Sequence, residues 1–170
     1  AVCTGAVVRA KRLADRPDGG TLAAGGPVMK DQAGAELYRV FPVRLLTVTA
    51  HDLAKGVYRR VWSSRPDIYP VPGTKPMTDE AWIAASSGGA TVLVIDSRGN
   101  FDAMFPDAGV LRAIGCGAAL TVPVLTRDGT VAGTVNMLDA DGWFVPGRIE
   151  GIVAGVRARS DALLRLLGSG

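Results

Sequence analysis

The chain has 170 residues, with an apolar fraction of 48% and a charged fraction of 21%, values typical of one globular domain with a hydrophobic core. Its 19 basic and 16 acidic side chains leave a net charge of +3, and the arginines are scattered without a nucleic-acid-binding motif. The apolar runs are much shorter than the roughly 20 residues that cross a bilayer. We therefore expect no nucleic-acid partner and no membrane partner.

Two cysteines and one histidine limit the possible redox and metal chemistry. Cys3 and Cys116 lie far apart in the sequence and form no disulfide framework. Together with His51 they are too few ligands for a zinc site. No basic-then-apolar leader opens the sequence, so secretion is not expected. These features indicate a reducing, cytoplasmic setting and no metal.

The N-terminal residues 1–30 are rich in alanine, glycine, aspartate and arginine and contain no aromatic residue. We interpret them as an arm outside the domain, either poorly packed or ordered against a partner subunit. A helix is predicted over residues 29–41, with Asp31 as its candidate N-cap and Pro42 as its end.

Two β-hairpins are predicted from alternating segments joined by glycine-containing turns. The first pairs residues 44–51 with residues 57–64, and the second pairs residues 118–126 with residues 130–138. Regular alternation in the strand 57–64 places Tyr58, Arg60, Trp62 and Ser64 on one face. Two hairpins indicate antiparallel strand pairing.

Residues 65–77, with the sequence RPDIYPVPGTKPM, carry four prolines and one glycine. Neither a helix nor a central strand tolerates that proline density, so we predict a long loop. Its apolar residues argue against disorder, and long loops in compact domains are often functional.

The remaining segments alternate between helices and one apolar strand. We predict a helix over 78–87 starting after Thr78, a strand over 91–96, a turn at 97–100, a short helix within 105–115, a loop over 139–147 and one closing helix over 145–167. Residues 168–170 form a tail. Helices at both ends and a sheet between them define an α+β layered domain.

Two segments carry a resemblance to a known family. RRVWSSRPDIYPVPGTKPM (residues 59–77) and AGVLRAIGCGAALTVPVLTRDGTVAGTVNML (residues 108–138) resemble a subgroup of bacterial GAF domains with YPxxGxKPM-like and GCGxxxxxPV-like segments. The resemblance covers residues 31–167. Trp62 stands where the subgroup usually has Tyr, Ala119 where it has Ser, and Thr121 where it has Asn.

The resemblance implies a central antiparallel sheet of five or six strands. Terminal helices would cover one face and often form a homodimer contact, while loops and short helices would roof a ligand pocket on the other face. GAF domains bind cyclic nucleotides, tetrapyrroles, haem, amino acids or other small effectors, and a few are enzymes with a reactive cysteine. Fold alone does not choose among these, so the cofactor stays unknown.

Several side chains are candidates for the chemistry of such a pocket. Cys116, between Gly115 and Gly117, is either a pocket thiol acting as nucleophile or ligand contact, or a small packed residue. Lys75 either binds an anion or is solvated. Tyr69 offers a hydroxyl and a ring wall, or it anchors the loop. The candidate ligand contacts are Tyr69, Lys75, Trp82, Asp96, Asp107, Cys116, Thr121 and Asn136.

Three further sets of polar residues have more than one interpretation. Asp102 and Asp107 are also candidate caps of the following short helix, and Asn136 is expected to find a backbone or ligand partner. The adjacent His51 and Asp52 could orient a base, although a surface hydrogen bond is the simpler interpretation.

We expect a sensor-like GAF domain that binds a small molecule bearing an anionic group near Lys75 and acts as a homodimer. The alternative is a small GAF-fold enzyme that uses Cys116 together with Lys75. A purely structural dimerisation module is the third possibility.

Overall fold

The computed structural model describes residues 32–77 and 91–168. The predicted arm, the Asp31 cap, the helix over 78–87 and Trp82 lie outside the described residues. No helix within the described ranges is long and apolar enough to cross a membrane.

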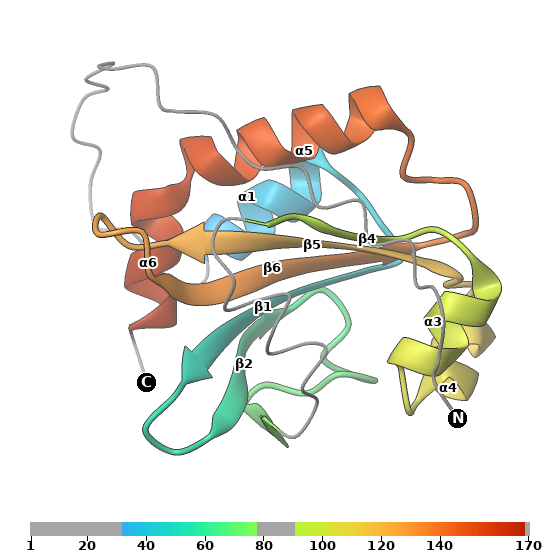
Figure 1. Cartoon of the computed structure of the whole chain (residues 1–170), viewed down its shortest axis with the longest axis horizontal. Helices are drawn as coiled ribbons and strands as arrows, with labels where there is room; N and C mark the ends of the chain where they lie inside the picture. Colours follow the sequence, from blue (N-terminus) through green and yellow to red (C-terminus); the bar gives the residue numbers. More distant parts are fainter. Residues whose placement is uncertain (1–31, 78–90, 169–170) are drawn as a thin grey trace.

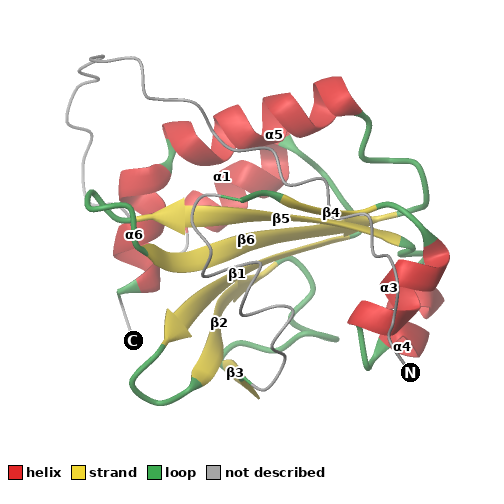
Figure 2. Ribbon diagram, viewed as in Figure 1, coloured by secondary structure: helices red, strands yellow, loops and turns green. Residues whose placement is uncertain are grey.

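Six strands of the described chain form one sheet in which every neighbouring pair is antiparallel, in the order β3-β2-β1-β6-β5-β4 (Figures 1 and 2). The strands are β1 (Leu45–Asp52), β2 (Val57–Ser63), β3 (Gly73–Pro76), β4 (Leu93–Ile95), β5 (Ala118–Leu125) and β6 (Val131–Asp139). Both predicted hairpins are confirmed, as β1 with β2 and β5 with β6. The predicted α+β class with a central antiparallel sheet is therefore confirmed.

Among the described helices, three cover one face of the sheet and two short ones lie at one end of it (Figures 1 and 2). The covering helices are α1 (Gln32–Val40), α5 (Pro146–Ala158) and α6 (Ser160–Leu167), and the short ones are α3 (Arg98–Met104) and α4 (Ala108–Ala113). Alternation along β1 separates the two faces. Leu46, Val48 and Ala50 belong to the core beneath the covering helices, while Leu45 belongs to a second cluster with α3 and α4.

The face of β2 changes at a β-bulge. Val48 pairs with Trp62, but the next residue, Thr49, pairs with Arg60, so Val61 is the extra residue. Trp62 therefore packs against α1, and Arg60 lies on the opposite face with Thr49. The predicted regular alternation, which placed Arg60 and Trp62 together, is wrong because one extra residue reverses the side-chain parity beyond it.

Three predicted boundaries also differ from the structure. The predicted loop contains the edge strand β3, which tolerates its terminal Pro76 because edge strands have unpaired backbone groups. The predicted turn at 97–100 begins the helix α3. The closing helix breaks at Arg159 into α5 and α6, which lets α5 lie on β5 while α6 contacts β1, β5 and β6.

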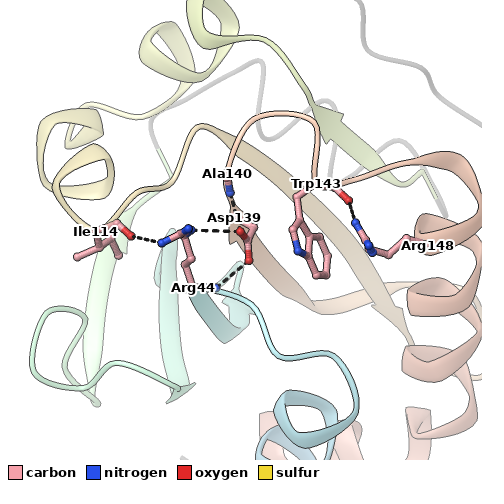
Figure 3. A network of polar contacts seen from close by, with 6 residues as sticks. All are labelled: Arg44, Ile114, Asp139, Ala140, Trp143 and Arg148. Atoms are coloured by element: carbon pink, nitrogen blue, oxygen red, sulfur yellow. Dashed lines mark hydrogen bonds and ion pairs between the residues drawn. The ribbon is translucent and has the colours of Figure 1, made fainter.

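A polar network fixes the end of the sheet beside α4 (Figure 3). The buried Asp139 carboxylate accepts hydrogen bonds from the Arg44 backbone N–H at 3.1 Å, the Arg44 Nε at 3.2 Å and the Ala140 N–H at 2.7 Å. Arg44 Nη1 also donates to the Ile114 carbonyl at 3.4 Å. The network ties the start of β1, the end of β6 and the chain after α4 together.

Candidate functional site

A cavity of about 270 Å³ opens on the sheet face opposite the covering helices. Its floor comes from β1, β2, β5 and β6, one wall comes from α3, α4 and their connection, and the other wall comes from residues 69–75. This volume lies just below the range of roughly 300–1,000 Å³ found for pockets of drug-sized ligands. The cavity therefore suits a smaller molecule.

The floor changes from apolar to polar along the strands, as the register of the sheet shows. Leu45 lies opposite Leu138 at the end of the sheet where α4 packs. Two residues further along, Thr47 lies opposite Asn136, which in turn lies opposite Thr121. Successive rows on one face are about 7 Å apart because each strand residue rises about 3.4 Å.

The third and fourth rows of the floor carry the cationic side chains. In the third row Thr49 lies between Thr134 and Arg60, and in the fourth row Tyr58 lies opposite Lys75. All five residues line the cavity. The polarity of the floor thus rises in one direction, from the leucines to the cations.

The Asn136 amide organises the middle of the floor. Its Nδ2 donates to Thr49 Oγ1 at 3.2 Å and to Thr47 Oγ1 at 3.4 Å, while its Oδ1 accepts from Thr121 Oγ1 at 3.1 Å. The partners of Asn136 are thus three threonine hydroxyls, whereas the sequence suggested a backbone or ligand partner. A hydroxyl that accepts still has its own proton to donate. Because Thr47 and Thr49 both line the cavity, an acceptor atom of a ligand there could take these protons.

Thr134 differs from the other three threonines of this floor, because its hydroxyl is not bonded to Asn136. It is 1% exposed, and its Oγ1 has no hydrogen-bond partner among the residues that the structure describes. An unsatisfied buried hydroxyl costs free energy. A ligand with a polar atom in this part of the cavity would remove that cost.

The two walls of the cavity meet at Tyr69. Its hydroxyl donates to the Asp107 carboxylate, which links the segment after β2 to the start of α4. Burial, followed by this hydrogen bond, raises the pKa of Tyr69. Asp107 occupies the N-cap position of α4, but its side chain does not cap the helix. The predicted capping role is therefore wrong for Asp107, and Asp102 instead forms an ion pair with Arg112.

Arg60 is held in place beneath the Tyr69 ring. Its guanidinium carbon lies 4.7 Å from the ring centroid, and its Nη1 donates to the Pro70 carbonyl at 2.9 Å. Gly73 permits this position, since a Cβ there would lie 2.6 Å from Nη1. Burial lowers the pKa of Arg60, with Tyr69 and Asp107 opposing the shift, and a guanidinium stays charged in proteins.

The cavity carries two cations and one anion among its described lining residues. Arg60 and Lys75 are positive and Asp107 is negative. Lys75 is exposed and has no carboxylate within 4.0 Å in the described part of the chain. The net charge of about +1 at the cavity favours an anionic group.

The predicted ligand contacts divide into three groups. Tyr69, Lys75, Asp107, Thr121 and Asn136 line the cavity. Asp96 follows β4, is exposed and does not line it. Trp82 lies outside the described residues.

Cys116 does not line the cavity either. It is 3% exposed and belongs to the apolar cluster of Leu45, Leu111 and Ala119. Burial, reinforced by the negative charge of Asp139, raises its pKa to about 11. The thiol is therefore protonated at neutral pH, which is the opposite of an activated nucleophile.

His51 is not part of a catalytic pair. Its ring packs edge-on against Tyr58 with centroids 4.9 Å apart, and its Nε2 is buried without a partner in the described chain. Burial lowers the His51 pKa to about 4. Asp52 instead accepts from the Lys55 backbone N–H at 3.1 Å, and His51 Nε2 does not form the expected surface hydrogen bond with any described residue.

The sequence interpretation missed Arg60, Tyr58, Thr47, Thr49 and Thr134 as cavity residues. Alternation in RLLTVTAH already places Thr47 and Thr49 on the same face as Leu45, and TVN places Thr134 with Asn136. These signals were available in the sequence. The bulge in β2, which brings Arg60 to the cavity, has no such signal.

No protein-family model matches the sequence, and no curated protein matches it. Solved structures do resemble it. The GAF domain/HD domain protein from Geobacter sulfurreducens has a TM-score of 0.64 at 15% identity, covering 85% of this chain and 99% of that one. The PixJ GAF domain from Thermosynechococcus elongatus has a TM-score of 0.56 at 19% identity, covering 80% and 83%.

The GAF-B domain of DevS from Mycobacterium smegmatis is a third similar structure. Its TM-score is 0.55 at 18% identity, with 78% of this chain and 88% of that chain covered. These likenesses show that the chain has the GAF fold. At such identities they establish the fold and not the ligand.

Proposed function

We propose that this chain is a sensor-like GAF domain whose cavity binds a small molecule bearing an anionic group. The observation that carries the proposal is a cavity with a hydroxyl-lined floor and two cations, Arg60 and Lys75, against one carboxylate. Apolar pockets with a few placed polar groups are typical ligand sites. The structurally similar PixJ is a cyanobacteriochrome receptor, which supports a sensory role for this fold.

Packing alone does not account for the cavity. If this face of the sheet only supported the two walls by packing, apolar side chains would fill it, because buried polar groups cost free energy unless they are paired. Here Thr134 Oγ1 is unpaired in the described chain, and Thr47 and Thr49 line the cavity with hydroxyls whose protons Asn136 does not use. This arrangement supports a bound acceptor atom.

A thermal-shift screen tests the proposal. The probes are sets of carboxylates, amino acids, purines and cyclic nucleotides. A ligand at 100 times its Kd stabilises the folded state by about 2.7 kcal/mol, which raises Tm by several degrees in a domain of this size. We expect at least one set to raise Tm.

A filled cavity provides the control for that screen. Thr134→Met extends a side chain into the cavity and should abolish the shift, whereas Thr130→Met in the exposed turn between β5 and β6 should keep it. If no probe raises the Tm of the unaltered protein, or if Thr134→Met responds as strongly as Thr130→Met, the cavity is not a ligand site.

We propose in addition that residues 31–167 act as one domain, as a homodimer, in the cytoplasm. The layer of α1, α5 and α6 supports this assignment, since terminal helices form dimer contacts in the GAF domains that the sequence resembles. Light scattering should give twice the molar mass of the chain. The mass of a single chain would contradict the dimer and leave the ligand site untouched.

The enzyme alternative has no supporting geometry. Lys75 lines the cavity and Cys116 does not, and the Cys116 thiol is buried with a raised pKa. We therefore retain ligand binding as the proposed function.

A further inference from the structure

We propose that the ligand is a small monocarboxylic acid of about six to eight carbons, counting the carboxyl carbon, with an unbranched or aryl tail. Its carboxylate would lie at Arg60 and Lys75, and its tail would lie along the strands toward Leu45 and Leu138. This inference rests on the proposed function, because it names the ligand class of the same cavity.

The length of the ligand follows from the rows of the floor. The leucine row and the Arg60 row are four residues apart along β1, which corresponds to about 13 Å. The cavity volume of about 270 Å³ lies just below the range of pockets for drug-sized ligands. An acid of about six to eight carbons, counting the carboxyl carbon, suits both this span and this volume.

The charge of the head group follows from the charges around it. Arg60 and Lys75 exceed Asp107 by one positive charge, so a monoanion neutralises the site and a dianion overshoots beside Asp107. Within the described chain, one of the five N–H donors of Arg60 is bonded to the Pro70 carbonyl. The remaining donors suit a carboxylate, which a guanidinium binds with two parallel hydrogen bonds.

An amine is the wrong head group for the same reason. The Asp107 carboxylate accepts the Tyr69 hydroxyl, and the two cations would repel an ammonium group. Thr49 lies in the same row as Arg60, and Thr47 lies in the next row. Each keeps a hydroxyl proton that a carboxylate oxygen or an adjacent carbonyl can accept.

The tail end of the cavity is apolar on both sides. Leu45 and Leu138 form the floor, while Leu111 from α4 and Met104 with Phe105 from the end of α3 form the wall. Burial of a methylene group contributes about 0.8 kcal/mol. Affinity should therefore rise with each carbon until the tail reaches the wall and then fall.

The first experiment measures Kd by calorimetry for butanoate, hexanoate, octanoate, decanoate, 3-phenylpropanoate, octanamide and octylamine. We expect affinity to peak at hexanoate or octanoate and octanamide to bind at least tenfold more weakly than octanoate. Equal binding of octanoate and octanamide, or affinity that rises without limit through decanoate, would overturn the inference.

The second experiment uses matched variants. Arg60→Met should weaken octanoate at least tenfold and leave octanamide unchanged, whereas Arg65→Met should change neither, because Arg65 pairs with the exposed Asp67 outside the cavity. Should Arg60→Met fail to fold by circular dichroism, Lys75→Ala against Lys55→Ala carries the test. An unchanged octanoate Kd in the folded Arg60 or Lys75 variant contradicts the head-group assignment.

The tail assignment has its own pair of variants. Leu138→Ala should move the preferred acid to a longer chain, and Leu163→Ala, a similar truncation in the core on the opposite face, should not. Failure here is distinct from failure of the proposed function. If amino acids or purines raise Tm while every acid fails, the sensor proposal stands and the ligand class falls, and if nothing binds, both fall.

Discussion

His51 couples the stability of the fold to pH. Burial lowers its pKa from an ordinary value near 6.5 to about 4, so the folded protein holds the ring neutral while the unfolded chain binds a proton below pH 6.5. Between these values the unfolded state carries more protons, and stability falls as pH falls. His51 is the only histidine, so this window belongs to one residue.

The prediction is a loss of stability on acidification from pH 7 to pH 4.5. Urea denaturation at several pH values should show the free energy of unfolding declining across this window, and His51→Gln should flatten the decline. A decline of equal slope in the variant would show that other groups cause it.

Cys116 should be an inert thiol despite its place in a glycine-flanked motif. With a pKa of about 11 and almost no exposure, it should resist iodoacetamide at pH 8 in the folded state and react after unfolding in urea. A Cys3→Ser background leaves Cys116 as the single thiol, and mass spectrometry reads its labelling. Rapid labelling of the folded protein would restore a reactive role.

Cys116 shows how far a sequence motif can predict a functional site. The motif suggested that Cys116 is functional, but its flanking glycines are explained by local geometry. Gly115 has a φ of +83°, and a Cβ on Gly117 would lie 2.5 Å from the Asp141 carboxylate. Burial then decides the chemistry of the thiol, and burial depends on which segments pack over it. The sequence does not state that packing.

At the scale of elements, α1 packs on β2 through one glycine. A Cβ built on Gly34 would lie 2.4 Å from the Trp62 ring, so α1 approaches the sheet where only a glycine fits. The ring is also packed beside Tyr38 at 6.3 Å between centroids. It therefore has little freedom to move away.

Gly34→Ala should destabilise the fold by about 1 to 2 kcal/mol. Overpacking costs about 1 to 3 kcal/mol, and the better helix propensity of alanine returns up to about 1 kcal/mol. Gly151→Ala, in α5 with open space around the glycine, should be neutral or stabilising. Chemical denaturation compares the two, and equal effects would contradict the contact between α1 and Trp62.

The strongly patterned elements were the predictable ones. Alternation and turn glycines located β1, β2, β5 and β6, because each strand of these hairpins finds its partner a few residues away. The bulge at Val61 and the edge strand β3 were not predictable, because both depend on how β2 meets a neighbour across the sheet. Arg60 was overlooked as a cavity residue for that reason.

At the scale of the whole molecule, the two faces of the sheet differ in the side chains that they carry. The face under α1, α5 and α6 is a continuous apolar core, and the other face combines an apolar cluster with the polar floor of the cavity. The Arg44–Asp139 network joins the start of β1 to the end of β6 and so fixes one end of the sheet. The main core and the proposed ligand site thus lie on opposite sides of the same strands.

The two walls of the cavity are 38 residues apart in sequence, and the Tyr69–Asp107 hydrogen bond joins them. Removing the Tyr69 hydroxyl should loosen both walls while the strands beneath stay paired, because local openings need only break the contacts that hold one segment. The loss should reduce global stability by only about 1.5 to 3 kcal/mol, the usual contribution of a hydrogen bond to a charged group.

Hydrogen exchange with mass spectrometry separates these effects. In Tyr69→Phe, amides of residues 65–72 and 105–110 should exchange faster, and amides of β1 and β6 should keep their relative protection. Tyr38→Phe is the matched control, since Tyr38 packs on Trp62 at the opposite face. If exchange in Tyr69→Phe rises evenly through the whole sheet, the walls do not open as separate units, and a ligand could enter only by a motion of the entire domain.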